Sequence, residues 1–390
     1  MREFITGNQA VVRGGLRAGC DFFAGYPITP ASSILTEFVR AFHAGRGIAV
    51  ETEDEIAAIG QCIGAAMCGR RVLTASSGPG LSLYSENIGL AQMGEVPMVI
   101  VNCQRMGPAT GGATATGEGD VLFARHVTSG GYPIPVLAAT DADSAYRLTY
   151  TAFNIAERLR TPVIVLTSKD IALTRQTADL DAIKLPPLQE RRQARADRPF
   201  IPYAIDALDD VPAFAPIGGV QRVRFTGSIH DENALLTIDQ TRIDRKLTHL
   251  RDKITAAAAS LEDVENDLDP AADTLIISYG SADGAARAAV QVLRARGTAV
   301  SHLTLYSLWP LPERAVRAAL TPAVRRIIMP ELNIGLYCDA IFRCVAPLTI
   351  ESILRYDGGL IAPQTIVDHV LGRAPSAPAA SAKGRAPCRC

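Results

Sequence analysis

Several features are missing from this 390-residue sequence, and each absence excludes a class of protein. Neither sign of charge dominates, because 39 Lys and Arg residues stand against 40 Asp and Glu residues. The balance gives no electrostatic reason to bind nucleic acid or an anionic membrane. No apolar run approaches the roughly 20 residues that a membrane-spanning helix needs. The first residues, Met1–Phe4, are unlike a signal peptide, so we expect a cytoplasmic protein.

The eight cysteines are not spaced as metal ligands. Six stand singly among apolar neighbours, as small buried hydrophobic residues do: Cys20, Cys62, Cys68, Cys103, Cys338 and Cys344. Cys388 and Cys390 are separated by one residue, which is too few for a Cys-x-x-Cys clip, and two ligands do not complete a zinc or iron–sulfur site. We therefore expect no metal and no cluster on this chain, and a dispensable tail at its end.

What the sequence does contain is the composition of a globular α/β protein, with 48% hydrophobic and 20% charged residues. Residues 5–175 alternate helical and strand-like patterns. Predicted helices span 8–18, 32–42, 55–68, 81–93 and 143–159, and predicted strands span 22–26, 48–51, 72–76, 97–102, 135–138 and 162–167. Such alternation predicts a parallel sheet wound on both faces, with ligands at the carboxyl ends of its strands.

The remainder divides into a connecting region and a second α/β unit. Charge runs and scattered prolines fill the chain from about 176, before a charged helix over 243–261. The second unit has predicted strands at 274–279, 299–306 and 326–331, and predicted helices at 285–296 and 313–320. From about residue 374 the Ala/Pro/Ser composition predicts a solvated, disordered tail.

The segment Gly25-Tyr26-Pro27-Ile28-Thr29-Pro30 follows the first predicted strand of the sheet. Its two prolines favour an extended, rigid backbone at the residue before each of them. The Thr29 hydroxyl would then be a preorganised hydrogen-bond donor. A stiff loop in which Pro30 begins the next helix is an equally good interpretation.

Four acids crowd into Glu51-Thr52-Glu53-Asp54-Glu55, directly before a run of small apolar residues. Acids are favourable at a helix N-terminus, but that does not explain the apolar run. Glu55 is the last acid before the helix turns inward, so it is best placed to lose its water. A partly buried carboxyl group can exchange a proton near neutral pH.

Two further patterns follow the next two strands. Ser76-Ser77-Gly78-Pro79-Gly80 lets the backbone approach a ligand closely, but it has neither a P-loop lysine nor dinucleotide-fingerprint spacing. A tight turn without a ligand fits it equally well. Arg105 lies just past a predicted buried strand and could grip a carboxylate with two parallel bonds. A surface arginine is the alternative.

Together these four patterns resemble the alpha subunit of the 2-oxoacid:ferredoxin oxidoreductases. The resemblance extends to about residue 372 through Gly7-Asn8-Gln9-Ala10, Thr226-Gly227, His230-Asp231-Glu232 and Pro330-Glu331-Leu332-Asn333. The acidic Glu53-Asp54-Glu55 form is most similar to the 2-oxoglutarate branch, with the pyruvate and branched-chain branches as alternatives. The implied fold is α/β: a thiamine-diphosphate-binding pyrimidine domain with a doubly wound parallel sheet (1–178), a connector (179–268), a transketolase C-terminal-like α/β domain (269–372) and a tail (373–390).

The resemblance also implies roles for individual residues. Glu55 would hydrogen-bond N1′ of the aminopyrimidine of thiamine diphosphate, Thr29 would hydrogen-bond the 2-oxoacid, and Arg105 would pair with its carboxylate. Further cofactor contacts would come from Tyr26, Pro27, Ile28, Ser77, Gly78 and Pro79. The implied reaction is oxidative decarboxylation of 2-oxoglutarate with coenzyme A to succinyl-CoA and CO2, with reduction of ferredoxin.

The Gly-Asp-Gly segment that holds Mg²⁺ in thiamine enzymes is absent from the sequence. The resemblance therefore implies a beta subunit that supplies the diphosphate site, Mg²⁺ and [4Fe-4S] ligands in an (αβ)2 assembly. Whether gamma or delta subunits join it is left open. Alone, this chain should be inactive.

The loop after Arg105 departs from the family pattern. Glu118-Gly119-Asp120 stands where members usually carry Gln-Gly-Asp, and Ser129-Gly130-Gly131 replaces a His-Gly-acid segment. These departures leave the identity of the 2-oxoacid open. A non-catalytic assembly subunit is another hypothesis, which the intact Thr29, Glu55 and Arg105 oppose, and a nucleotide-binding module built on residues 77–82 is a third. We expect His126 to be a surface or core residue and His230 to serve packing or an interface.

Overall fold

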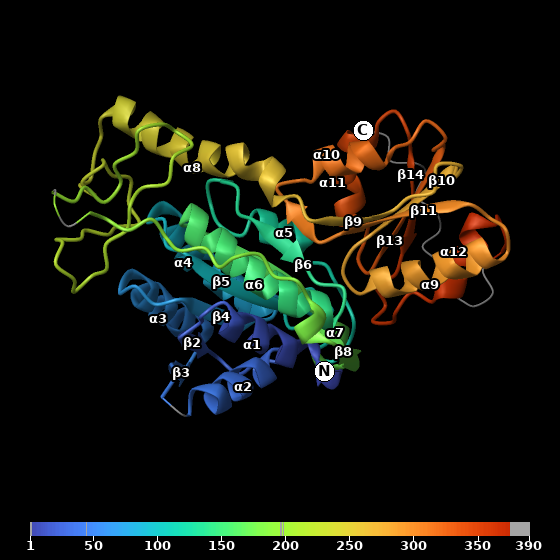
Figure 1. Ribbon diagram of the computed structural model, residues 1–390, viewed down its shortest axis with the longest axis horizontal. Coiled ribbons are helices and arrows are strands. Elements are labelled where there is room, and N and C mark those ends of the chain that lie inside the picture. The colour runs from blue at the N-terminus through green and yellow to red at the C-terminus, as the bar shows by residue number, and fades with distance from the viewer. Residues whose placement is uncertain (1, 44, 196, 198, 375–390) are drawn as a thin grey trace.

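The computed structural model describes residues 2–43, 45–195, 197 and 199–374 (Figure 1). The Cys388–Cys390 pair and most of the predicted tail lie outside these residues. No helix in the described part of the chain combines the length and the apolar character needed to cross a membrane.

The first domain is built on a seven-stranded sheet. Its strand order is β12 (Ser307–Trp309), β6 (Val136–Ala138), β7 (Pro162–Ser168), β5 (Met98–Gln104), β4 (Val72–Ser76), β2 (Phe22–Gly25) and β3 (Ile48–Glu51). All neighbours are parallel except β12, which runs antiparallel to β6. Helices cover both faces, so the predicted doubly wound parallel sheet is confirmed.

The two faces of this sheet have separate cores. Helices α1 (Gly7–Arg17), α2 (Ser32–Phe42) and α6 (Ala142–Leu159) pack on one face, and α3 (Glu55–Met67), α4 (Gly78–Met93) and the short α5 (Val121–Arg125) pack on the other. Strand β5 shows why: Val99, Val101 and Cys103 point into the first core, while Met98 and Ile100 point into the second. A strand buried on both faces needs a continuous apolar run, which is the pattern that the sequence has here.

The C-terminal domain has a five-stranded sheet with the order β14 (Ile350–Leu354), β13 (Arg326–Glu331), β10 (Thr274–Ser278), β11 (Val300–Leu305) and β9 (Val264–Asp267). Only β9 is antiparallel to its neighbour. Helices α9 (Ala282–Ala295) and α12 (Pro363–Val370) pack on one face, and α10 (Glu313–Ala319) and α11 (Leu336–Val345) lie toward the first domain. The second predicted α/β unit is thus present, with strands and helices that the sequence patterns missed.

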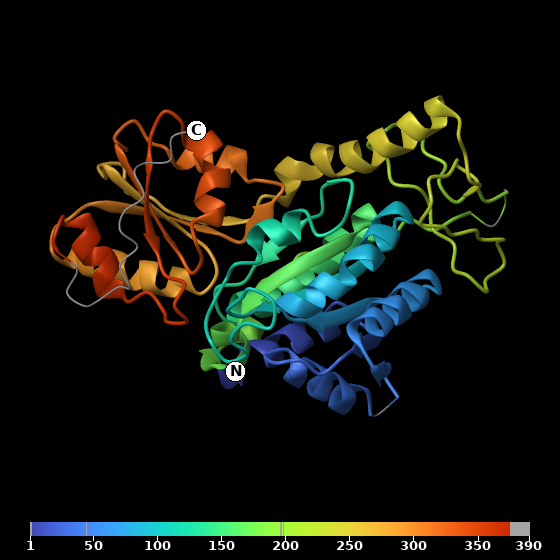
Figure 2. The ribbon, with the colours of Figure 1, turned by 180° about the vertical axis from the view of Figure 1, so that it is seen from behind.

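Between the domains, the chain has little regular structure until the long helix α8 (Gln240–Leu261), seen from behind in Figure 2. Before it come α7 (Lys169–Leu173), a 3-10 turn (Leu180–Ala182) and strand β8 (Arg175–Ala178), which pairs with β1 (Glu3–Thr6). The charge runs are not uniformly solvated: Arg191 is buried and makes a bidentate ion pair with buried Glu157, at 2.5 and 2.7 Å.

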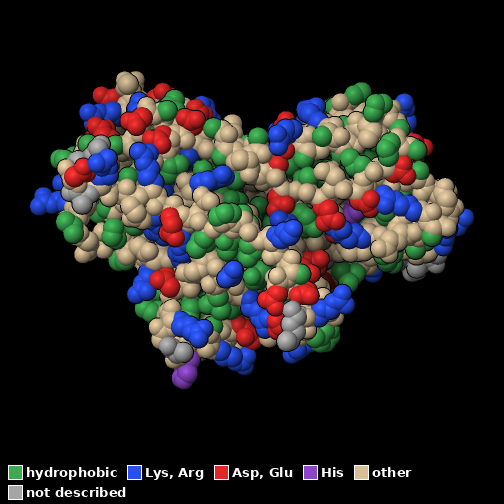
Figure 3. Space-filling model, viewed as in Figure 1, with side chains coloured by type: hydrophobic (Ala, Val, Ile, Leu, Met, Phe, Trp, Pro, Cys, Tyr) green, Lys and Arg blue, Asp and Glu red, His purple; other side chains and the backbone are tan. Residues whose placement is uncertain are grey.

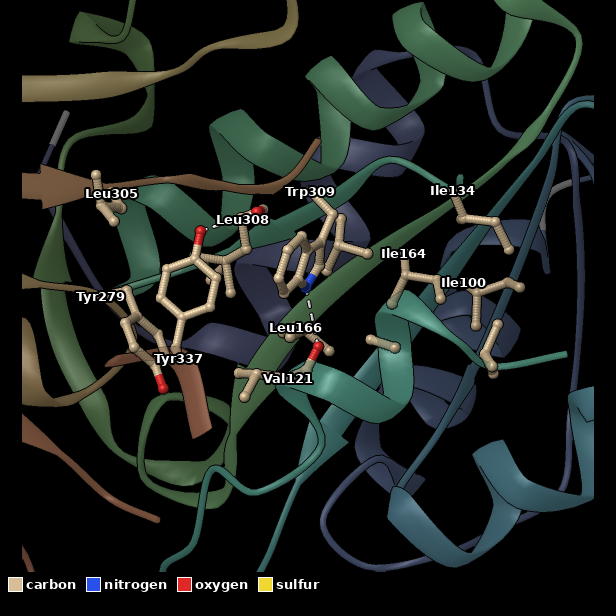
Figure 4. Packing of buried hydrophobic residues seen from close by; sticks show 14 of the residues in the cluster. Ile100, Val121, Ile134, Ile164, Leu166, Tyr279, Leu305, Leu308, Trp309 and Tyr337 are labelled. Atoms are coloured by element: carbon tan, nitrogen blue, oxygen red, sulfur yellow. Dashed lines mark hydrogen bonds between the residues drawn. The ribbon is translucent and has the colours of Figure 1, made fainter. Parts of the chain in front are cut away.

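The predicted strand over 299–306 needs a correction where it ends. After β11 the chain leaves the second sheet and adds β12 to the edge of the first. Trp309 at the end of β12 donates a hydrogen bond to the Val121 carbonyl oxygen at 2.9 Å and packs edge-on against Tyr337 (Figure 4). The two domains therefore share a hydrophobic core.

Candidate active site

Four of the patterns singled out above meet at one edge of the first sheet. Strands β5, β4, β2 and β3 are neighbours in that order and run parallel. Their carboxyl ends therefore lie along the same edge, and each is followed by one of the four candidate segments. Ligands of open α/β sheets bind at such an edge.

Glu55 is placed by the start of helix α3. Asp54 is the N-cap, and its carboxylate accepts a hydrogen bond from the Ala57 amide at 2.7 Å. One of the four clustered acids therefore stabilises the helix N-terminus, which is the role that acids commonly have there. Glu55 is the first helical residue and only 6% exposed. Within the described chain its carboxyl group has no hydrogen-bond or ion-pair partner, so it is available to a ligand.

The Ser77–Gly80 segment is not a tight turn, because helix α4 already begins at Gly78. Ser77 is its extended N-cap and Pro79 lies in the first turn, where the missing N–H of proline costs nothing. A Cβ atom on Gly80 would lie 1.9 Å from Ser76 Oγ and 2.6 Å from Glu55 Oε1. Glycine at this position is therefore what lets the Glu55 carboxyl group lie beside the start of α4.

Arg105 and Thr29 are brought together although 76 residues separate them. Arg105 is 7% exposed, and its guanidinium group donates from Nη1 to the Thr29 carbonyl oxygen at 2.6 Å and from Nη2 to the Thr110 carbonyl oxygen at 3.0 Å. The Thr29 segment is held in turn by Asn8 Nδ2, which donates to the Pro30 carbonyl oxygen at 2.8 Å. Arg105 is therefore not the surface arginine of the alternative interpretation. Among the described residues, no carboxylate lies within ion-pair distance of it.

Asp120 is a site residue that the sequence patterns did not single out. Its Oδ2 accepts from Asn102 Nδ2 at 2.8 Å, its amide donates to Gln104 Oε1 at 3.0 Å, and it lies against Gly78 at the start of α4. Burial raises the pKa of Asp120, while the bond from Asn102 and the charge of Arg105 act to lower it. In the sequence, the only indication of Asp120 was that the Glu118-Gly119-Asp120 segment departs from the family pattern.

Buried polar atoms without a hydrogen-bond partner gather at this edge. They are Ser76 Oγ, Ser77 Oγ, Asn102 Oδ1, Arg105 Nε and Thr167 Oγ1, which lie in or just after β4, β5 and β7. Native structures satisfy nearly all buried polar groups, so such a concentration indicates a polar ligand. The aminopyrimidine of a thiamine cofactor, which the sequence resemblance implies, fits this donor and acceptor set.

The remaining predicted contact residues lie on the same strand ends. Tyr26 and Pro27 are exposed, Ile28, Gly78 and Pro79 are half-buried, and Ser77 is buried. The histidines lie elsewhere: His126 is exposed, and His230 is buried with its ring centroid 4.3 Å from that of Tyr203. His230 thus packs, as expected. No group of three or more His, Cys, Asp or Glu side chains in the described chain could hold a metal ion.

The site lies at the carboxyl edge of a doubly wound sheet. It contains a buried carboxyl group, a buried guanidinium group and a helix N-terminus where glycine leaves space for a ligand. These features are typical of α/β enzymes that bind their ligand at the strand ends. A split-gene transketolase superposes with a TM-score of 0.50 at 11% identity over 94% of this chain and 95% of its own, a likeness of fold alone.

Comparison with known proteins is more specific. Residues 13–248 match the family model described as pyruvate flavodoxin/ferredoxin oxidoreductase, thiamine diphosphate-binding, and residues 272–366 match pyruvate:ferredoxin oxidoreductase core domain II. This chain therefore belongs to the 2-oxoacid:ferredoxin oxidoreductase family.

Three similar proteins illustrate the family. The 2-oxoglutarate synthase subunit KorA of Archaeoglobus fulgidus is 37% identical over 95% of this chain and 99% of its own. The ketoisovalerate oxidoreductase subunit VorB of Methanothermobacter thermautotrophicus is 32% identical over 94% and 97%. The 2-oxoglutarate:ferredoxin oxidoreductase of Magnetococcus marinus, solved with 2-oxoglutarate, coenzyme A and succinyl-CoA bound, is 30% identical with a TM-score of 0.86. That match covers 95% of this chain and 65% of the longer solved chain.

Proposed function

We propose that this chain is the alpha subunit of a 2-oxoglutarate:ferredoxin oxidoreductase, which converts 2-oxoglutarate and coenzyme A to succinyl-CoA and CO2 and reduces ferredoxin. Support comes from the names of the relatives, several of which are 2-oxoglutarate synthase subunits covering nearly the whole chain. The division into residues 1–178, 179–268 and 269–372 is part of the proposal.

The observation that carries the proposal is a buried carboxyl group and a buried guanidinium group that lie at one sheet edge without ion-pair partners among the described residues. Arg105 and Glu55 are both buried, and neither has an ion-pair partner among the described residues. A buried charge without a partner is costly, and proteins keep such groups where a ligand or a reaction uses them. A 2-oxoacid offers a carboxylate to Arg105, and an aminopyrimidine offers a ring nitrogen to Glu55.

Each residue then has a role that its position permits. The bonds from Arg105 to the carbonyl oxygens of Thr29 and Thr110 use two of its five N–H donors and orient the rest. Arg105 would bind the substrate carboxylate, and the Thr29 hydroxyl would hydrogen-bond the substrate beside it. Glu55 would hold and exchange a proton at N1′ of the aminopyrimidine. Thiamine diphosphate, when bound, would supply a nucleophilic carbon for the keto group of the substrate.

The proposed enzyme also requires a partner subunit. We infer that it holds the diphosphate, Mg²⁺ and [4Fe-4S] clusters, and that coenzyme A and ferredoxin react in the assembled (αβ)2 enzyme. Two substrate alternatives remain: a branched-chain 2-oxoacid, favoured by the ketoisovalerate relative, and pyruvate. A non-catalytic assembly role is the remaining alternative from another class.

The first test is viologen reduction by the chain co-expressed with its beta subunit. With 2-oxoglutarate and coenzyme A, we expect Glu55→Gln to lower the rate by at least about 100-fold, the scale of a lost proton-transfer group. Glu53→Gln is the matched control, because Glu53 is exposed in the same acidic run and should leave the rate unchanged.

Equal rates for wild type and Glu55→Gln would support the assembly role and contradict the proposed catalysis. A substrate panel on the same complex separates the branches. We expect the highest kcat/KM for 2-oxoglutarate, and a preference for 2-oxoisovalerate or pyruvate would correct the substrate while leaving the reaction class intact.

A further inference from the structure

A cavity of about 520 Å³ lies where the first domain, helix α8 and the C-terminal domain meet. The cavity is lined by Arg125 of α5, by Arg343 of α11 and by residues at the end of α8. Residues within 131–134 and 309–314 complete the lining. In Figure 3 the molecule is hollowed along its upper margin between the lobe that carries α8 and the C-terminal domain. The volume falls within the roughly 300–1,000 Å³ of small-molecule sites.

The charges on this wall do not cancel. Arg314 pairs with Glu262 at 3.3 Å, and Glu313 lies 4.0 Å from Arg317, which is not part of the wall. Arg125 and Arg343 are left, and no carboxylate of the described chain lies within ion-pair distance of either. Three arginines against two glutamates leave the wall with one surplus positive charge, and neither Arg125 nor Arg343 has an ion-pair partner among the described residues.

Arg125 is held in place although it is not neutralised. Its guanidinium lies 4.4 Å from the centroid of the Trp309 ring, and that ring is fixed by its own hydrogen bond to the Val121 carbonyl oxygen (Figure 4). A cation–π contact orients a guanidinium but leaves its charge in place. Burial lowers the pKa of Arg125, and the positive charge of Arg343 lowers it further, so the two groups repel each other.

Apart from Thr255, the rest of the wall has no polar side chain. It is formed by Pro133, Ile134, Ala258, Trp309, Pro310 and Leu311. An apolar wall with a few convergent polar groups is the usual composition of a ligand site, and guanidinium groups bind phosphate and carboxylate through paired N–H donors.

We propose that this cavity binds a small organic anion, a phosphate monoester or a carboxylate with an apolar body, whose charged group lies between Arg125 and Arg343. The proposal is independent of the reaction proposed above. Helix α5 runs from Val121, next to Asp120, to Arg125, so a bound anion would hold the helix that directly follows the candidate active-site loop.

Trp309 provides the assay, because it is the only tryptophan in the sequence and lines the cavity. The full chain is titrated with hexyl phosphate, hexanoate and inorganic phosphate while its tryptophan fluorescence is followed. We expect a saturable change with hexyl phosphate, hexanoate or both, which distinguishes a phosphate from a carboxylate site. Inorganic phosphate, which lacks the apolar body, should bind more weakly.

Arg343→Gln is the decisive variant, because Arg343 is exposed and its loss leaves the core intact. It should weaken binding about tenfold, the effect of one lost charge-assisted hydrogen bond. Arg296→Gln, an exposed arginine at the end of α9 and outside the cavity, is the control and should bind as wild type does.

No saturable signal at millimolar ligand, or equal affinities for the Arg343→Gln and Arg296→Gln variants, would overturn the proposal. The titration is repeated on the complex with the beta subunit. Loss of binding there would identify the cavity as a subunit contact and would also overturn the proposal.

Discussion

At the scale of single residues, the candidate active site contains glycines that leave space for ionisable side chains. Gly80 is the clearest case, because any side chain there would collide with Ser76 and Glu55. Gly60, on the preceding helix α3, has open space where its Cβ would be. The two glycines therefore make a matched pair of test positions.

We expect Gly80→Ala to displace the Glu55 carboxyl group and to lower the rate of viologen reduction to nearly that of Glu55→Gln. Gly60→Ala should keep full activity and raise the unfolding free energy by about 0.5–1 kcal/mol, because alanine is favoured over glycine within a helix. Full activity of Gly80→Ala would show that the position of Glu55 beside α4 does not matter.

Arg105 provides a second residue-scale prediction, for substrate binding. Arg105→Gln in the assembled enzyme should lower kcat/KM for the 2-oxoacid by roughly 100-fold, since a charge-assisted pair is lost. Arg105→Lys should recover part of this loss, because lysine keeps the charge but not the planar fork. Steady-state kinetics measures both, and an unchanged kcat/KM in Arg105→Gln would remove Arg105 from the substrate site.

The sequence predicted Glu55, Thr29 and Arg105 because each follows a recognisable strand in a motif of its own. It could not predict Asp120 and Asn102 as partners, because their contact depends on how the irregular chain after Arg105 returns to the sheet. Nor could it predict that Thr29 would bind Arg105 through its carbonyl oxygen, which every residue type possesses.

At the scale of elements, helix α8 is fixed to the first domain by one buried acid. Glu95 is fully buried and accepts hydrogen bonds from Lys246 at 2.7 Å, Lys253 at 2.6 Å and His249 at 3.0 Å. All three donors lie on α8. Burial alone would raise the pKa of Glu95, but Lys246 and Lys253 hold it well below its usual value.

Glu95→Gln should therefore cost about 3–5 kcal/mol of unfolding free energy, because it leaves two buried ammonium groups without a counter-charge. Chemical denaturation measures the loss. The pH dependence has a definite sign: the folded-state pKa is depressed, so the stabilisation is present above about 4.5 and is lost as the pH falls below that value. The difference between wild type and variant should shrink in acid, and a difference that is constant with pH would contradict this assignment.

Long periodic elements were predicted well, and the reasons for the misses are physical. Helix α2 and strands β4 and β13 have the predicted bounds, since buried apolar residues define them, and the short, half-exposed strand β3 also has its predicted bounds. Helix α4 begins three residues earlier than expected, because Gly78-Pro79-Gly80 has the composition of a turn although proline is compatible with a first helical turn.

At the scale of the whole molecule, the two domains are joined by a strand that the C-terminal part of the chain contributes to the first sheet. Strand β12 comes from the C-terminal part of the chain but completes the first sheet, and Leu308 and Trp309 fill the shared core. Glu118 adds a polar link, because its Oε1 accepts from the amide and the hydroxyl of Ser281. Strand β12 has only three residues, which is too short for sequence periodicity to indicate a strand.

A chain that ends at Leu268 should therefore fail to fold as the first domain does in the full chain. It would expose the edge of β6 and leave part of the core unfilled. We expect poor solubility or a clearly lower thermal midpoint, measured by circular dichroism. A truncated chain that unfolds cooperatively at the midpoint of the full chain would show that β12 is dispensable.

The most direct measurement of the central claim is the rate of hydrogen–deuterium exchange at the thiazolium C2 of thiamine diphosphate in the assembled complex. If the buried Glu55 carboxyl group exchanges a proton with the aminopyrimidine, Glu55→Gln should slow this exchange by at least about 100-fold while the affinity for thiamine diphosphate changes far less. Exchange at the wild-type rate in a fully loaded Glu55→Gln complex would contradict the account.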